Sequence, residues 1–108
     1  MTDYNPNKTG KYEELFNSWL YASEINEQKF IEIAKAKPFE IHTMQRNGMF
    51  HLRMTCNGVQ LGREFIAPIH GRDDLKINII YMLLFVAQKL DNVYGEKYFS
   101  DIVSDFLT

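Results

Sequence analysis

A cysteine and two histidines are the residues of this chain that could form a nucleophile and its base. Cys56 is the only cysteine among the 108 residues, and His42 and His51 lie in the same central segment. A thiolate activated by an imidazole requires the two groups to be within hydrogen-bond reach. The alternating pattern of this segment places Cys56 on the face of its strand opposite to both histidines. We therefore expect Cys56 to be a buried structural residue and the protein not to be an enzyme.

The same histidines share their predicted sheet face with Glu40 and Glu64, and imidazoles with carboxylates are groups that can ligate a metal. Arg53 interrupts this set on the same face, which is typical of the solvated side of a sheet. The sequence also contains no phosphate-binding glycine loop, no nucleophile elbow and no zinc-binding His-Glu-x-x-His motif. We expect neither a metal nor a cofactor.

The composition is that of one ordinary globular domain. Hydrophobic residues make up 45% and charged residues 24%, and the formal net charge is −2. This charge excludes a whole-molecule attraction for nucleic acid or anionic lipid. The longest apolar run, residues 79–87, is about half as long as a membrane-spanning helix. The N-terminus lacks the features of a signal peptide, and the single cysteine favours a reducing compartment, so we expect a cytoplasmic protein without membrane contact.

Two Asn-Gly pairs, at 47–48 and 57–58, predict two tight hairpins in the central segment, because Asn-Gly favours a two-residue turn. These turns predict the facing pairs Thr43 with Leu52, Ile41 with Met54, Cys56 with Val59, Met54 with Leu61, and Phe50 with Phe65. One face of the resulting meander then carries Phe39, Ile41, Phe50, Leu52, Met54, Cys56, Val59, Leu61 and Phe65. The other face carries Glu40, His42, Met44, His51, Arg53, Thr55, Gln60 and Glu64.

Helical patterns flank the meander. Residues 1–10 are polar and are expected to form a flexible leader, with a single domain over residues 11–108. Apolar residues at helical spacing begin at Tyr12, weaken at residues 23–26 and resume until Pro38, which predicts one bent helix or two short ones.

A second helical region is predicted over residues 75–90, with Asp73 or Asp74 as its cap and Gly95 as its stop. A last amphipathic helix follows Gly95. The sequence thus predicts an α+β domain of order α-β-β-β-α, with a three-stranded antiparallel meander packed on helices and an added C-terminal helix.

The helix over residues 75–90 is apolar nearly all round, so a contact on one side cannot bury it. Either the other helices or a second subunit must cover it. The second alternative makes the protein a homodimer, and the residues expected at that interface are Tyr81, Met82, Phe85, Phe99 and Phe106.

The predicted order of elements over residues 26–90 resembles the double-stranded RNA-binding domain. The resemblance is carried by the segments 38–41 (PFEI), 48–54 (GMFHLRM) and 57–64 (NGVQLGRE). The family binds RNA duplexes, and the basic residues of the central segment that could contact phosphates are Arg46, Arg53, Arg63, Arg72 and Lys76. The family's long first hairpin loop is replaced here by a short turn, and two aspartates stand where its second helix begins with lysines, which removes phosphate-neutralising charge. Members of the family that lose these features often serve in protein contacts or dimerisation.

The sequence therefore favours a small non-enzymatic protein-interaction module, with a homodimer as one form of it. The residues expected to contact a protein partner are His42, His51, Arg53 and Glu64 on the polar sheet face. The small size also suits a phage or mobile-element protein that inhibits a host factor. The alternative function is double-stranded RNA binding through the basic residues named above.

Overall fold

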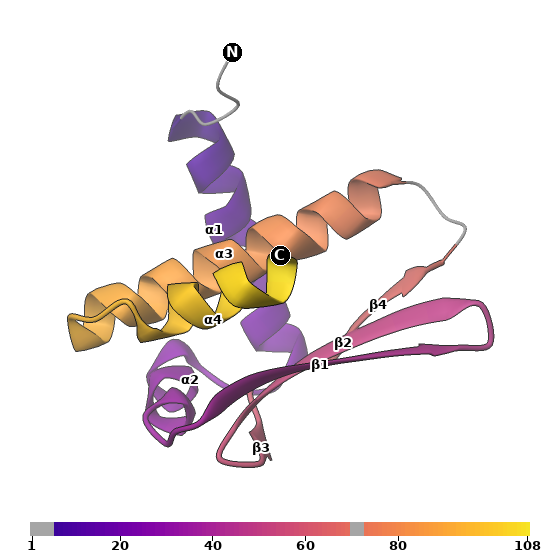
Figure 1. Ribbon diagram of the computed structural model, residues 1–108. Coiled ribbons are helices and arrows are strands. Elements are labelled where there is room, and N and C mark those ends of the chain that lie inside the picture. The colour runs from indigo at the N-terminus through magenta and orange to yellow at the C-terminus, as the bar shows by residue number, and fades with distance from the viewer. Residues whose placement is uncertain (1–5, 70–72) are drawn as a thin grey trace.

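The computed structural model describes the backbone of residues 6–69 and 73–108, and the side chains of residues 12–69 and 77–108 (Figure 1). The chain is an α+β protein, as predicted. Its elements are α1 (Pro6–Ala22), α2 (Glu27–Ala34), β1 (Phe39–Arg46), β2 (Met49–Cys56), β3 (Val59–Gln60), β4 (Phe65–Pro68), α3 (Asp73–Tyr94) and α4 (Tyr98–Leu107).

The sheet is antiparallel and four-stranded, with β1 at one edge, β2 in the centre, and both β3 and β4 paired to the other side of β2. The first hairpin has the predicted register: Thr43 faces Leu52 and Ile41 faces Met54. The second Asn-Gly turn likewise sets Cys56 opposite Val59. Both turns form as predicted because Asn47, Gly48, Asn57 and Gly58 all adopt the positive φ values that a type I′ turn requires.

The predicted third strand is broken into β3 and β4. Phe50 faces Ala67 and Leu52 faces Phe65, so the predicted pairing of Phe50 with Phe65 is wrong by two residues. The two extra residues lie between Gln60 and Phe65, where the Leu61 N–H still donates to the Met54 carbonyl over 2.8 Å. Because the shift is even, each side chain keeps its predicted face of the sheet.

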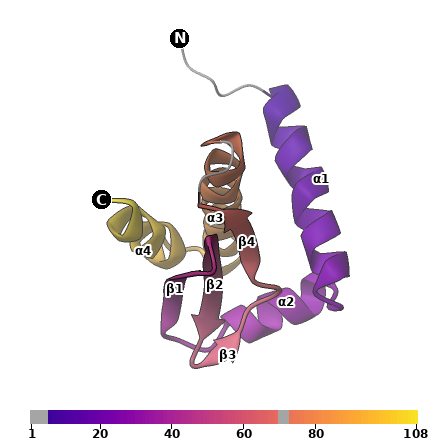
Figure 2. The same cartoon turned by 90° about the vertical axis from the view of Figure 1, so that its right-hand side faces the viewer.

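Helices α1, α3 and α4 form a layer on one side of the sheet, with α3 in the middle, and α2 lies beside β3 (Figure 2). The core between these layers contains Phe16, Trp19, Phe30, Phe39, Leu52, Met54, Cys56, Leu61, Leu83, Val86, Leu90, Phe99 and Val103. Most apolar side chains of α3 are thus covered by other elements of the same chain, whereas Ile77, Tyr81 and Val93 remain exposed.

The N-terminal region forms two helices, one of the two arrangements predicted. Helix α1 begins at Pro6, five residues before the predicted start of the domain, and proline is favoured at a first helical position because its missing N–H is not needed there. Helix α3 extends from Asp73 to Tyr94, a turn beyond the predicted end, and Gly95 follows with φ 67°. The predicted cap of α3, Asp73 or Asp74, has its side chain outside the part of the chain whose side chains are described.

Helix α4 is attached to α3 through Asp91, a buried carboxylate near the end of α3. Its Oδ1 accepts the Phe99 N–H over 2.9 Å, and its Oδ2 accepts the N–H of Ser100 over 3.2 Å and the Ser100 hydroxyl. These N–H groups belong to the first turn of α4 and have no partner within that helix. A residue of α3 therefore provides the cap that α4 lacks in its own sequence.

Two residues depart from their predicted environments, although each stays on its predicted face. Val59 is 55% exposed because the short β3 extends past the layer of helices, whereas Thr55 is only 2% exposed on the polar face.

Over the described parts of the chain, we find no helix with the length and apolarity needed to span a membrane.

Candidate functional site

The thiol of Cys56 lies in the core, as predicted. The side chain is 0% exposed, and burial raises the pKa of the thiol to about 11. The candidate base His42 lies on the other face of the sheet and has its Nε2 2.9 Å from the Thr55 hydroxyl. Burial and the raised pKa both disfavour the thiolate, the form in which a cysteine acts as a nucleophile.

The predicted partner-binding residues lie together on the side of the sheet opposite to the helix layer, where no helix of the described chain covers them (Figure 1). Two exposed apolar residues accompany them. We call this surface the open face and define it by His42, Met44, His51, Arg53, Glu64 and Ile66.

A row of side chains crosses the open face over three strands. Met44 of β1 faces His51 of β2, which in turn faces Ile66 of β4. Met44 is 48% exposed and Ile66 is 52% exposed, so an apolar group stands on each side of a half-buried imidazole. Facing residues in a sheet have their Cβ atoms about 5 Å apart, so these three side chains form one continuous patch.

Polar contacts fix both imidazoles of the open face. His51 Nδ1 is 3.2 Å from Glu64 Oε1, which joins β2 to the segment before β4. His42 Nε2 lies against the hydroxyl of Thr55, and His42 faces Arg53 across the β1–β2 ladder. Each ring thus has a hydrogen-bond partner that favours one orientation.

The open face does not gather a metal site. Over the described residues, no group of three or more histidine, cysteine or acidic side chains is arranged to hold a metal ion. His42 and His51 each engage a different protein group, so the two imidazoles do not converge on one point.

The basic residues expected to contact RNA are spread along the sheet. Arg46 is exposed at the end of β1 beside the first hairpin turn, Arg53 is half-buried in the middle of β2, and Arg63 is exposed in the segment between β3 and β4. The side chains of Arg72 and Lys76 lie outside the described part of the chain. The three described arginines do not form one cluster.

The residues expected at a helix-mediated dimer interface are mostly used within the chain. Met82 and Phe99 are buried in the core, and the ring of Phe85 packs 5.6 Å from that of Phe16. Tyr81 lies 5.5 Å from Tyr12 by ring centroids and is partly exposed, as is Phe106. A second copy has no access to Met82 or Phe99, because α1 and α4 already flank α3.

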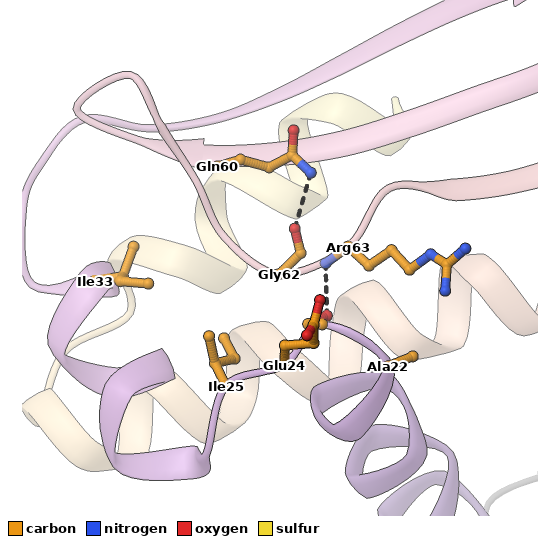
Figure 3. A pocket seen from close by; sticks show the side chains of 8 residues that line it. Ala22, Glu24, Ile25, Ile33, Gln60, Gly62 and Arg63 are labelled. Atoms are coloured by element: carbon orange, nitrogen blue, oxygen red, sulfur yellow. Dashed lines mark hydrogen bonds between the residues drawn. The ribbon is translucent and has the colours of Figure 1, made fainter.

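Sequence reasoning missed an open cleft of about 490 Å³ between the α1–α2 connection and β3 (Figure 3). Its lining residues are Ala22, Ser23, Glu24, Ile25, Ile33, Gln60, Gly62 and Arg63. The Arg63 N–H donates to the Ser23 hydroxyl over 2.7 Å, and the Gln60 amide donates to the Gly62 carbonyl over 2.9 Å. The Ser23–Arg63 bond thus joins the end of α1 to the segment between β3 and β4, whereas the Gln60–Gly62 bond is local to that segment.

Trp19 completes this junction beneath the cleft. Its indole N–H donates to the Arg63 carbonyl over 2.8 Å, and its ring stacks on Phe65 at 5.4 Å. Gly62 has φ +77° and lies so close that a Cβ there would be 2.1 Å from the indole ring. Gly62 was the available signal in the sequence, since a glycine inside a strand pattern often marks a bulge or a close approach.

Comparisons of the chain with protein-family models, with curated proteins and with solved structures find no match. The likeness to the double-stranded RNA-binding domain stays a prediction from the sequence.

Proposed function

We propose that the protein is a protein-interaction module and that the open face is its partner-binding surface. The observation that carries this proposal is the row Met44, His51 and Ile66, in which exposed apolar side chains alternate with a fixed imidazole. Exposed apolar side chains gathered beside polar groups are typical of surfaces that bind other proteins.

The chemistry of the open face defines the kind of partner that it fits. Arg53 and Glu64 provide one positive and one negative group beside the apolar row, and His42 adds a polar imidazole ring. Because the charges are mixed, the face suits a protein surface with its own apolar centre and charges of both signs better than a polyanion.

Aspartate substitutions at the two ends of the row test the proposal. Met44→Asp and Ile66→Asp each put a charge where a partner must exclude water, so the double variant should lose at least about tenfold in affinity. The partner is first captured from cell extracts on the immobilised protein and then purified. Its binding to wild type and to each variant is then measured by titration. Val59→Asp is the matched control, because Val59 is also apolar and 55% exposed but points to the other face of the sheet.

Equal binding by wild type and the double variant would contradict the proposal that the open face binds the partner. Loss of binding by the Val59→Asp control would contradict it as well. Circular dichroism of each variant separates loss of the surface from loss of the fold.

Duplex RNA binding is the alternative that the same proteins can test. A labelled duplex of about 20 base pairs is titrated at low and at physiological salt, and binding through phosphates would show a steep salt dependence. Tight, salt-sensitive binding that Arg46→Ala and Arg53→Ala reduce would replace the proposed protein contact with a nucleic-acid one.

A further inference from the structure

The free edge of β1 presents a row of backbone hydrogen-bonding groups. In an antiparallel pair joined by a two-residue turn, the two residues that flank the turn form a hydrogen-bonded pair. Along the two strands, every second facing pair is then also hydrogen-bonded. Arg46 flanks the turn, so the even-numbered residues of β1 direct their N–H and C=O groups to β2. The odd-numbered residues Ile41, Thr43 and Gln45 direct theirs to the outer side.

The start of β1 confirms this alternation. The Asn57 N–H donates to the even-numbered Pro38 over 2.8 Å, whereas the Phe39 N–H points away from β2 and donates to the Tyr98 hydroxyl over 2.9 Å. Tyr98 of α4 thus satisfies the first outward N–H of the edge. Over the described residues, no comparable bond reaches Ile41, Thr43 or Gln45.

Apart from the charged residues Glu40 and Arg46, strand β1 lacks the features that usually protect an edge. It contains no proline, no lysine and no bulge, and all eight of its residues pair in regular register with β2. A long, regular and uncovered edge pairs readily with another strand.

The charges at the two ends of β1 make the edge complementary to itself. Glu40 lies near its start and Arg46 at its end, both are exposed, and neither has an ion-pair partner among the described residues. In an antiparallel pair of two β1 strands, the outward residues must face each other. With Thr43 on the two-fold axis, Ile41 faces Gln45 and Glu40 of each copy faces Arg46 of the other.

The other registers that keep this hydrogen-bonding pattern lose that match. A shift of one step to either side sets Glu40 opposite Met44 or opposite Gly48, and leaves Arg46 without a carboxylate. Opposite charges that face each other across a ladder stabilise the pairing, so the charges favour a single register.

Helix α4 is the helix that lies next to the β1 edge (Figure 2). Helix α4 packs over the first part of β1, where Phe99 contacts Phe39 with ring centroids 5.2 Å apart, and its C-terminal end lies nearer the middle of the strand (Figure 1). Thr43 and Gln45, farther along β1, are exposed on the helix side. A two-fold axis perpendicular to the sheet would place the two α4 helices over opposite halves of the paired strands.

We propose that two copies of this chain associate through antiparallel pairing of their β1 edges, with Thr43 on the two-fold axis and reciprocal ion pairs between Glu40 and Arg46. This interface uses the strand edge and leaves the open face of both copies accessible, so it goes beyond the proposed binding of another protein. It also differs from a dimer through α3, most of whose apolar side chains are covered within the chain.

Charge reversal tests the interface. Glu40→Arg sets two arginines opposite each other twice in the dimer, and Arg46→Glu does the same with two glutamates. Each single variant should dissociate at a concentration about tenfold higher than wild type or more, measured by sedimentation velocity over a concentration series. The double variant, Glu40→Arg with Arg46→Glu, restores both pairs and should dimerise like wild type.

A mixture gives the sharpest result. The two single variants should form a heterodimer when mixed, because each carries the charges that the other needs. Glu14→Arg and Arg63→Glu are matched reversals at exposed positions outside β1 and should leave the dimer unchanged. A wild-type protein that stays monomeric throughout the series overturns the proposal, and so does a dimer that the single reversals leave intact.

Discussion

The β1 edge of the sheet and the edge formed by β3 and β4 differ in length, in regularity and in what lies beside them. Strand β1 runs for eight residues without interruption, whereas the opposite edge is divided between a two-residue strand and a four-residue strand. Strand β4 ends at Pro68, which has no N–H, so that edge offers a further strand little to bond with.

The two edges of the sheet also differ in the tertiary contacts that they make. At the β3–β4 edge, the indole of Trp19 occupies the space beside Gly62 and bonds to the Arg63 carbonyl. At the β1 edge, the only comparable contact is that of Tyr98 with Phe39 in the described part of the chain. One edge is thus closed by a helix of the same chain, and the other is contacted in this way only at its first residue within the described part of the chain.

Gly62→Ala should produce the largest loss, since it breaks the closed edge. The new Cβ would lie 2.1 Å from the Trp19 ring in a backbone conformation with φ +77°. Displacement of the indole and the left-handed conformation together should cost about 4 kcal/mol of unfolding free energy in urea titrations. Gly58→Ala is the control: it has φ +81° with nothing within 4 Å, and should cost about 1 kcal/mol. Equal losses would show that Trp19 does not restrict Gly62.

Proline substitutions in β1 distinguish its two rows of backbone groups. Met44→Pro removes an N–H that bonds to β2 and should destabilise the fold by about 3 kcal/mol, whereas Thr43→Pro removes an outward N–H and should cost about 1 kcal/mol. Thermal unfolding at low protein concentration measures both without a contribution from self-association. The reverse order would contradict the deduced alternation along β1.

Raised pH should lower the unfolding free energy through Cys56, which lies in β2, the strand between the two edges. The pKa of its thiol is about 11 in the folded protein, against an ordinary value of 9.0, so the unfolded chain releases this proton first. Unfolding free energy should therefore fall by up to about 3 kcal/mol as pH rises from 9 to 11. Cys56→Ala, compared with wild type in denaturant titrations at each pH, should show a shallower decline. An identical decline would assign the effect to other groups, such as Tyr94, whose pKa is also raised by burial.

The smallest effect is expected at the exposed end of the β3–β4 edge. Val59 is 55% exposed, so Val59→Thr keeps the branched side chain and removes little burial. The change in unfolding free energy should stay within about 0.5 kcal/mol. A loss well above that value would mean that β3 packs against part of the chain and does not simply extend into solvent.

The hairpins could be predicted from the sequence because their information is local. Each Asn-Gly pair specifies a turn whose geometry sets the register of its own two strands. The face assignments also survived the break after Gln60, since an insertion of two residues leaves the alternation unchanged. For this reason, His42, His51, Arg53 and Glu64 share a face as predicted.

The break itself depends on a contact between residues far apart in the chain. Nothing near Gly62 indicates that Trp19, more than forty residues earlier, occupies the space beside it. The same limit applies to α3, whose apolar surface suggested a second subunit until the positions of α1 and α4 were known. The outward groups of β1 were missed because a strand's place at an edge is a property of the whole sheet.

Trp19 is the only tryptophan in the chain, and it stands at the junction of α1 with the sheet. Its fluorescence consequently reports on that junction alone. The indole is buried, hydrogen-bonded and stacked on Phe65, so its emission should lie at short wavelength and shift to the red when α1 separates from β4. Because the label is native, a partner that opens this end of the molecule can be distinguished optically from one that binds without disturbing it.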